Sequence, residues 1–210
     1  AMVTRMTPQK GFDLVQCVLD ELMEEQGMAF VLLGTGNAEY EDFMRSAEWR
    51  HKGRLCAYIG YDEALSHRVY AGSDFLLMPS SFEPCGLSQM IAMRYGTLPI
   101  VRETGGLRDS VQPYNRFTGE GTGFSFANFN AYELAETVRR ALALYRDEHD
   151  AYLRVQRQAM AQDFSFTRSA EDYAHLYLLL LPEDTAPKHD AGDEAFRRPL
   201  GALETGAAVR

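Results

Sequence analysis

Cysteine is scarce in this sequence. The 210 residues contain three, Cys17, Cys56 and Cys85, with no close pair and no Cys-x-x-Cys. Such an odd, sparse set is typical of reduced thiols, so the sequence predicts a cytoplasmic location rather than a disulfide framework. Long hydrophobic runs are also missing. The longest, residues 176–181, is far too short to span a membrane, and no signal peptide is visible, so we expect no membrane partner.

Positive charge is in deficit as well. The chain has 21 Lys and Arg against 30 Asp and Glu, a formal net charge of −9. This balance makes nucleic acid an unexpected partner. An acidic protein that binds an anion must do so with a few local cations and backbone amides.

The hydrophobic pattern alternates short apolar runs with amphipathic stretches, which predicts a parallel sheet wound with helices. The fold class is therefore α/β, with a Rossmann-like parallel sheet and helices on both faces. Residues 2–4 are only the end of a first strand, and the N-terminal Ala-Met looks like a cloning remnant. The expected strands are 29–33, 55–59, 74–78, 98–101 and 123–126, and the expected helices are 10–26, 40–47, 63–71, 86–95, 132–145, 151–161 and 167–181.

The composition changes after residue 181. Residues 182–210 are rich in Pro, Ala, Gly, Asp and Glu and have few large apolar side chains. We expect one domain over 1–181, followed by a flexible or loosely docked tail over 182–210.

The loops that follow the strands carry the unusual residues, and in doubly wound sheets ligands bind at these carboxyl ends. Arg5 follows the first strand, and Lys10 is expected to open a helix. A cation there opposes the helix dipole, a conflict that an anionic ligand would remove. Two solvated surface cations remain an alternative, because this dipole effect is only ~0.3–1 kcal/mol at a surface.

Three further loops are candidates for ligand contact. Gly34 and Gly36 form a short turn that lets a ligand approach the backbone, although such turns are common. Tyr61 at a strand end is a candidate for stacking on a nucleobase, or it covers the edge of the core. Glu83 lies just before an expected helix whose free amides suit phosphate or sugar, unless it merely caps that helix. A second anion site is predicted at Thr104-Gly105, before a short helix.

Five motifs occur in an order that resembles a known family. They are Arg5-x-x-x-Gln9-Lys10-Gly11, Gly60-Tyr61, Ser81-Phe-Glu83-Pro-Cys85-Gly86-Leu87-x-Gln89, Tyr95-Gly-Thr-Leu-Pro and Thr104-Gly-Gly-Leu107. Together they look like the C-terminal, donor-binding half of bacterial glycogen synthases and plant starch synthases, glycosyltransferase family 5, over about residues 3–181. The resemblance implies one lobe of a two-lobed GT-B enzyme whose N-terminal lobe lies outside this chain. It also implies transfer of glucose from ADP-glucose to the non-reducing end of an α-1,4-glucan with retention, and no metal or other cofactor.

The same resemblance implies roles for individual residues. Arg5 and Lys10 would neutralise the leaving diphosphate, and Glu83 would contact the transferred glucose; these three form the catalytic set. The substrate-binding set has backbone, phosphate, adenine and nucleoside contacts and comprises Gln9, Gly34, Gly36, Tyr61, Cys85, Gly86, Leu87, Thr104 and Gly105.

Two positions depart from related transferases. Retaining relatives often carry a second Glu eight positions after the first, where this chain has Ile91, so a scheme with two carboxylates is not supported. Glu103, before Thr104, stands where relatives often have a basic or small residue, and it would either weaken phosphate binding or point away.

Three other functions are compatible with an α/β fold of this kind. A UDP- or GDP-sugar transferase of the same architecture would share the Arg, Lys and Glu. A non-catalytic nucleotide-binding module is the second alternative, and the chain by itself is expected to be inactive because a facing lobe must close over the donor. A Rossmann dehydrogenase is excluded, because no Gly-x-Gly-x-x-Gly follows a first strand.

Overall fold

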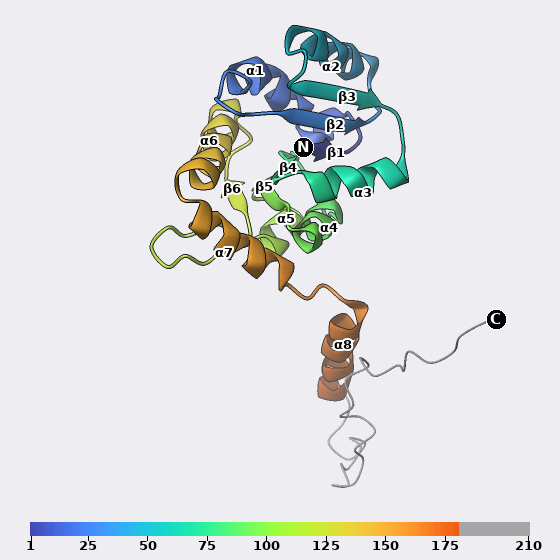
Figure 1. Cartoon of the computed structure of the whole chain (residues 1–210). Helices are drawn as coiled ribbons and strands as arrows, with labels where there is room; N and C mark the ends of the chain where they lie inside the picture. Colours follow the sequence, from blue (N-terminus) through green and yellow to red (C-terminus); the bar gives the residue numbers. More distant parts are fainter. Residues whose placement is uncertain (181–210) are drawn as a thin grey trace, which may run out of the picture. The chain divides into compact units, whose positions relative to one another are not determined.

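The computed structural model of the chain describes residues 1–180 (Figure 1). The expected tail over 182–210 and the end of the expected 1–181 domain lie outside the described residues. One compact unit spans Ala1–Gln162, and a second begins at Asp163. Among the described residues, the second unit contains the helix α8 (Phe166–Leu180).

The strands of the first unit form two three-stranded parallel sheets, β1-β2-β3 and β4-β5-β6. The Leu77 amide of β4 donates a 2.8 Å hydrogen bond to the carbonyl of Ala1, directly before β1. The order across both sheets is therefore β3-β2-β1-β4-β5-β6, the order of a doubly wound Rossmann-like fold. The strands are β1 (Met2–Val3), β2 (Phe30–Gly34), β3 (Leu55–Ile59), β4 (Phe75–Met78), β5 (Leu98–Arg102) and β6 (Phe124–Phe126).

Helices cover both faces of these strands, as predicted. α1 packs on α6, and α3 packs on α4; Figure 1 shows the two pairs on opposite sides of the central strands. The helices are α1 (Phe12–Leu22), α2 (Ala38–Arg50), α3 (Glu63–Gly72), α4 (Ser88–Tyr95), α5 (Gly105–Ser110), α6 (Ala131–Asp147) and α7 (His149–Met160). No described helix is both long and apolar enough to cross a membrane.

The apolar side chains that recur along α1 form its buried face. Phe12, Val15, Leu19 and Leu22 are each at most 2% exposed. Burying a side chain of this size stabilises a fold by about 1.5–3 kcal/mol, so this stripe holds α1 against the sheet and α6.

The predicted start of this helix at Lys10 is wrong. Residues Pro8–Lys10 form a separate 3₁₀ turn, η1, and Gly11 has a left-handed φ of 77° before α1 begins. A Cβ on Gly11 would lie 2.1 Å from the carbonyl oxygen of Pro79. The helical conformation is therefore interrupted at a glycine, because the backbone after β1 passes directly against the backbone after β4.

Candidate functional site

The two central strands, β1 and β4, lie side by side although 71 residues separate Val3 from Phe75 in the sequence. The strand order reverses between them, and ligands of doubly wound sheets bind at such a switch point, beyond the carboxyl ends of the strands. The loop after β1 carries Lys10, and the loop after β4 carries Glu83. The structure therefore brings together two residues that the sequence assigned to separate loops.

Lys10 and Glu83 form an ion pair at this point, with 2.5 Å between Lys10 Nζ and Glu83 Oε2. The buried Ser80 hydroxyl also donates to Glu83 Oε2, at 3.2 Å. The expected conflict of Lys10 with a helix dipole is wrong, because Lys10 is the last residue of η1 and its charge faces a carboxylate. Glu83 does not cap α4 either, since Leu87 occupies the N-cap position with no side-chain cap.

Gln9 ties the two loops to each other. Its carbonyl accepts hydrogen bonds from the Ser81 amide at 2.9 Å and the Ser81 hydroxyl at 3.2 Å. Its side-chain amide donates to the carbonyl of Phe82 at 3.1 Å. Gln9 thus has a structural partner on the Glu83 loop, and its expected contact with substrate stays a prediction.

Cys85, Gly86 and Leu87 form a loop before α4, which begins at Ser88 rather than near Gly86. Within the described residues, the amides of these three have no hydrogen-bond acceptor. Free amides before a helix suit an anion or a sugar hydroxyl.

The side chain of Gln89 holds this loop by hydrogen bonds to its backbone, a role that the sequence did not predict. Its side chain is fully buried, and Nε2 donates to the carbonyls of Cys85 at 3.1 Å and Gly86 at 3.0 Å. The signal was present, because Gln89 lies four residues before the fully buried Met93 and so on the inward face of α4.

The loop after β5 packs directly against the Glu83 loop. A Cβ on Gly105 would lie 2.2 Å from the Glu83 carbonyl oxygen, and one on Gly106 would lie 2.1 Å from that of Cys85. The Gly106 amide donates to the Glu83 carbonyl at 3.1 Å. The paired glycines are therefore needed for contact between the two loops.

Glu103 is hydrogen-bonded away from this contact. Its Oε1 accepts a 2.7 Å hydrogen bond from the hydroxyl of Ser125 on β6. Of the two outcomes expected for this carboxylate, pointing away is the one observed. At the other departure from the family, Ile91 packs against a small apolar cluster that includes Tyr70 and Leu76.

Arg5 and Tyr61 lie at the same edge and are exposed. The guanidinium of Arg5 makes no hydrogen bond or ion pair with any other described residue. Tyr61, just after β3, is 86% exposed, so the alternative that it covers the edge of the core is wrong. Both side chains are free to meet a ligand.

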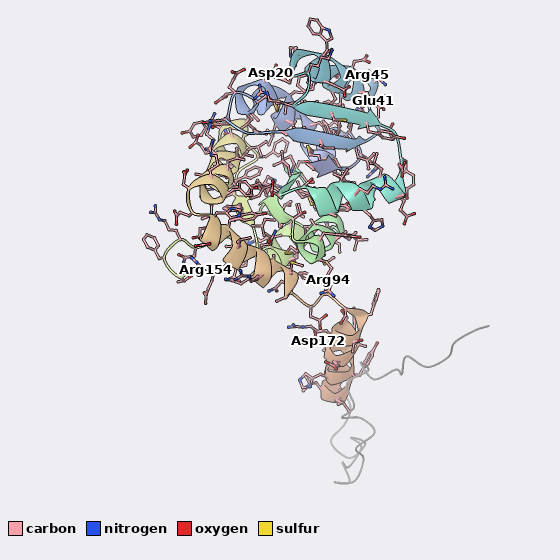
Figure 2. All side chains as sticks on the ribbon, viewed as in Figure 1. Asp20, Glu41, Arg45, Arg94, Arg154 and Asp172 are labelled. Carbon is pink, nitrogen blue, oxygen red and sulfur yellow. The ribbon has the colours of Figure 1, made fainter. Side chains whose placement is uncertain are left out.

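Gly34 and Gly36 have an intramolecular reason to be glycines. Added Cβ atoms would lie 1.8 Å from the Thr4 carbonyl oxygen and 2.0 Å from that of Met6. Glu41, paired with Arg45 on α2 (Figure 2), accepts from the Gly36 amide at 3.0 Å. This bond and one from the Thr35 hydroxyl lower the pKa of Glu41. The turn is thus held by its own chain, and nucleoside contact there stays a prediction.

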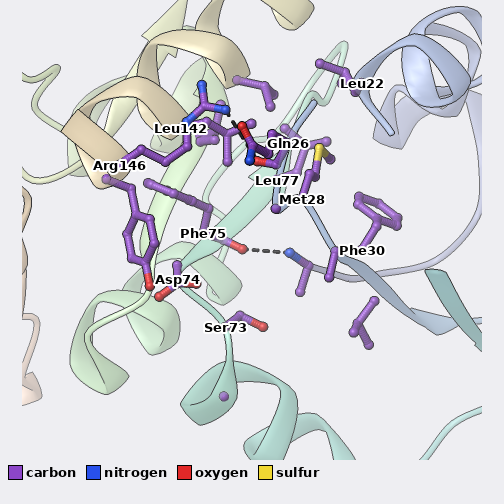
Figure 3. A pocket seen from close by; sticks show the side chains of 18 residues that line it. Leu22, Gln26, Met28, Phe30, Ser73, Asp74, Phe75, Leu77, Leu142 and Arg146 are labelled. Carbon is purple, nitrogen blue, oxygen red and sulfur yellow. Dashed lines mark hydrogen bonds between the residues drawn. The ribbon is translucent and has the colours of Figure 1, made fainter. Parts of the chain in front are cut away.

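The described residues also line a pocket away from these loops. It has a volume of about 300 Å³ and lies at the amino ends of β2 and β4, beside Phe30, Phe75 and Leu142 (Figure 3). The Ala1 amine donates to the Phe75 carbonyl there at 2.7 Å, and burial lowers the pKa of this amine to about 5. None of the predicted site residues lines this pocket. Among residues 1–180, no three His, Cys, Asp or Glu side chains gather where they could hold a metal ion.

Comparisons with known proteins agree on the kind of lobe. Residues 1–158 match the sequence profile described as "Glycosyl transferases group 1". The glycogen synthase of Geobacillus thermodenitrificans is 53% identical over 184 residues, which are 88% of this chain and 38% of that protein. The glycogen synthase of Bacillus subtilis is 50% identical over 177 residues, 84% of this chain and 36% of that protein. The chain therefore spans under two fifths of the length of these relatives.

Solved structures give the same fold. The catalytic domain of starch synthase IV from Arabidopsis thaliana, bound to ADP and acarbose, has a TM-score of 0.74 and 38% identity, covering 84% of this chain and 37% of that one. HepE from Anabaena in complex with UDP-glucose has a TM-score of 0.62 at 19% identity, covering 84% and 48%. The second likeness concerns the fold alone.

Proposed function

The chain belongs to the family of group 1 glycosyl transferases, and from that premise we propose that it is the donor-binding lobe of a glucan synthase. The reaction is transfer of glucose from ADP-glucose to the non-reducing end of an α-1,4-glucan, with retention and without a metal. The observation that carries the proposal is the Lys10–Glu83 pair at the switch point, directly before the free amides of residues 85–87. A cation suits a diphosphate, and a carboxylate and free amides suit sugar hydroxyls. The carboxyl edge of the sheet therefore offers contacts for both parts of a sugar diphosphate.

In this proposal the cations act on the diphosphate and the carboxylate acts on the sugar. Lys10 and the exposed Arg5 stabilise the charge that develops as ADP leaves, an effect typically worth a few kcal/mol per group. Glu83 contacts the glucose. The amides of the 85–87 loop bind the sugar, and Thr104 with Gly105 binds the phosphates.

The nucleoside lies further along the same edge of the sheet. Tyr61 stacks on adenine, an assignment supported by its 86% exposure at the end of β3. Gly34 and Gly36 leave room for the nucleoside, and Gln9 reaches the substrate from the loop that it shares with Lys10.

The choice of ADP over UDP or GDP is part of the proposal. It is supported by about 50% identity to glycogen synthases and by 38% identity to a starch synthase solved with ADP. The UDP-glucose complex is 19% identical and supports no choice of base. The glucan acceptor and a cytoplasmic location complete the proposal, and the three free cysteines fit a reducing compartment.

For the 210 residues alone, we propose donor binding without turnover. The chain spans 38% of the first relative's length, and two-lobed active sites work by closing over the donor to exclude water. This second function, nucleotide binding by itself, is the one to measure first.

Isothermal titration calorimetry of the chain with ADP, UDP and GDP tests the proposal. We expect ADP to bind, and Lys10→Ala to weaken it by about tenfold, the equivalent of one lost charge-assisted contact of ~1.4 kcal/mol. Lys52→Ala removes an exposed lysine outside the site and should leave affinity unchanged. Equal binding of the three nucleotides, or none, would overturn the ADP assignment. Unchanged affinity in Lys10→Ala would mean that Lys10 only pairs with Glu83 and does not contact the diphosphate.

A further inference from the structure

Arg102, the last residue of β5, reaches back to the loop that carries Glu83. Its Nε donates to the Ser80 carbonyl at 2.8 Å, and its Nη2 donates to the Ser81 carbonyl. Its Nη1 lies 3.5 Å from the carbonyl of Ala127, and the guanidinium lies 5.9 Å from the ring centroid of Phe129. Three carbonyls and one aromatic face thus surround a single cation.

No carboxylate among residues 1–180 pairs with Arg102, since the described ion pairs are all made by other side chains. Glu103, the nearest acid in the chain, is bonded to Ser125 instead. The guanidinium therefore uses its planar, rigid set of donors on two consecutive backbone carbonyls, which a lysine ammonium does not match in geometry.

Both anchored residues act on Glu83 or its neighbours. The Ser80 hydroxyl, in a residue 1% exposed, donates to Glu83 Oε2 at 3.2 Å. The Ser81 amide donates to the carbonyl of Gln9, next to Lys10. Fixing the carbonyls of Ser80 and Ser81 therefore fixes one hydrogen-bond donor to the carboxylate and the link to the loop of its cationic partner.

We propose that Arg102 is a positioning residue for Glu83: it clamps the backbone at Ser80 and Ser81 and so sets where the carboxylate meets the sugar. The inference rests on the proposed function for the contact with sugar, whereas the clamp itself is independent of any ligand. The proposed sugar transfer would then depend on a side chain that touches neither substrate nor reacting atoms.

The clamp is tested without ligand by amide hydrogen exchange on the whole chain. In Arg102→Met we expect exchange of the Ser81 amide to rise by on the order of tenfold, because the loop opens locally, with no change in α1 or β2. In Arg102→Lys we expect a Ser81 exchange rate between those of the wild-type chain and Arg102→Met, since lysine keeps the charge but lacks the planar set of donors. Arg116→Met is the matched control, because Arg116 lies 5.8 Å from the ring of Phe117 but holds no carbonyl among the described residues. Unchanged exchange at Ser81 in Arg102→Met would overturn the clamp.

Its effect on the sugar is tested by the ratio of affinities for ADP-glucose and ADP, measured by calorimetry. We expect Arg102→Met to reduce the preference for ADP-glucose by about fivefold to tenfold while ADP affinity stays the same, as Glu83→Gln should, and Arg102→Lys to recover part of it. Faster exchange with an unchanged ratio would make Arg102 merely structural and overturn its role toward Glu83. If the wild-type chain binds neither compound, the proposed function fails and the role toward the sugar falls with it, while exchange still decides whether the clamp exists.

Discussion

At the scale of single residues, the pair of Lys10 and Glu83 has two tasks that compete. Without ligand, each neutralises the other across 2.5 Å, with side chains 18% and 9% exposed. In the proposed complex with a sugar diphosphate, the ammonium would also contact phosphate. Without ligand, the ion pair gives the buried carboxylate a partner.

Removing only the cation should destabilise the fold more than removing both charges. Lys10→Met leaves the Glu83 carboxylate buried with the Ser80 hydroxyl as its remaining side-chain donor. We expect a loss of about 2 kcal/mol in unfolding free energy, less than the 3–5 kcal/mol of fully buried pairs because Lys10 is partly exposed. Lys10→Met with Glu83→Gln should recover at least half of this loss, as urea denaturation would measure.

An exposed ion pair provides the control for this experiment. Arg45 and Asp42 pair at 2.8 Å on α2, with side chains 52% and 75% exposed. Arg45→Met should change the unfolding free energy by less than about 0.5 kcal/mol. If the double variant at Lys10 and Glu83 were as unstable as Lys10→Met alone, the buried charge would not be the cause of the loss.

At the scale of elements, the loop after β5 and the loop before α4 form one packed unit. Gly106→Ala places a Cβ about 2.1 Å from the Cys85 carbonyl oxygen, so one backbone must move. We expect a loss of about 3 kcal/mol, at the upper end for overpacking, and weaker ADP binding because Thr104 and Gly105, the proposed phosphate contacts on the same loop, shift. Thermal unfolding and calorimetry measure the two effects.

Gly72 is the matched control glycine. It ends α3, and an added Cβ there would meet no atom within 4 Å. Gly72→Ala should be neutral or stabilise the chain by up to about 1 kcal/mol, because alanine restricts the unfolded state more than glycine does. Equal effects at Gly106 and Gly72 would contradict the tight packing of the two loops.

At the scale of the whole molecule, the sequence predicted the α/β class and most elements, because strand and helix periodicities are local. Its assignment of ligand-binding residues to the loops after the strands stays a prediction. It did not predict that β1 lies beside β4, which pairs Lys10 with Glu83, because strand order depends on contacts between distant segments. The clamp of Arg102 was missed for a related reason. Its partners are backbone carbonyls, which leave no residue pattern in a sequence.

The chain divides into two compact units after Gln162. Every predicted site residue lies in Ala1–Gln162, and every member of the main buried core lies between Met2 and Ala159. The described part of the second unit has no buried residue in α8, where Phe166 is 93% and Leu180 is 73% exposed; Asp172 marks this helix in Figure 2. A protein of residues 1–162 should therefore keep the same core and the same site.

We expect this shortened protein to bind ADP within about twofold of the full chain, a difference of ~0.4 kcal/mol, and to unfold at a similar urea midpoint. It should also be less prone to associate, because the exposed apolar side chains of α8 are removed with the second unit. Calorimetry, urea denaturation and sedimentation velocity measure the three properties. A loss of ADP binding with an unchanged urea midpoint would mean that residues beyond Gln162 contribute to the site, and the donor lobe would then extend past the compact unit.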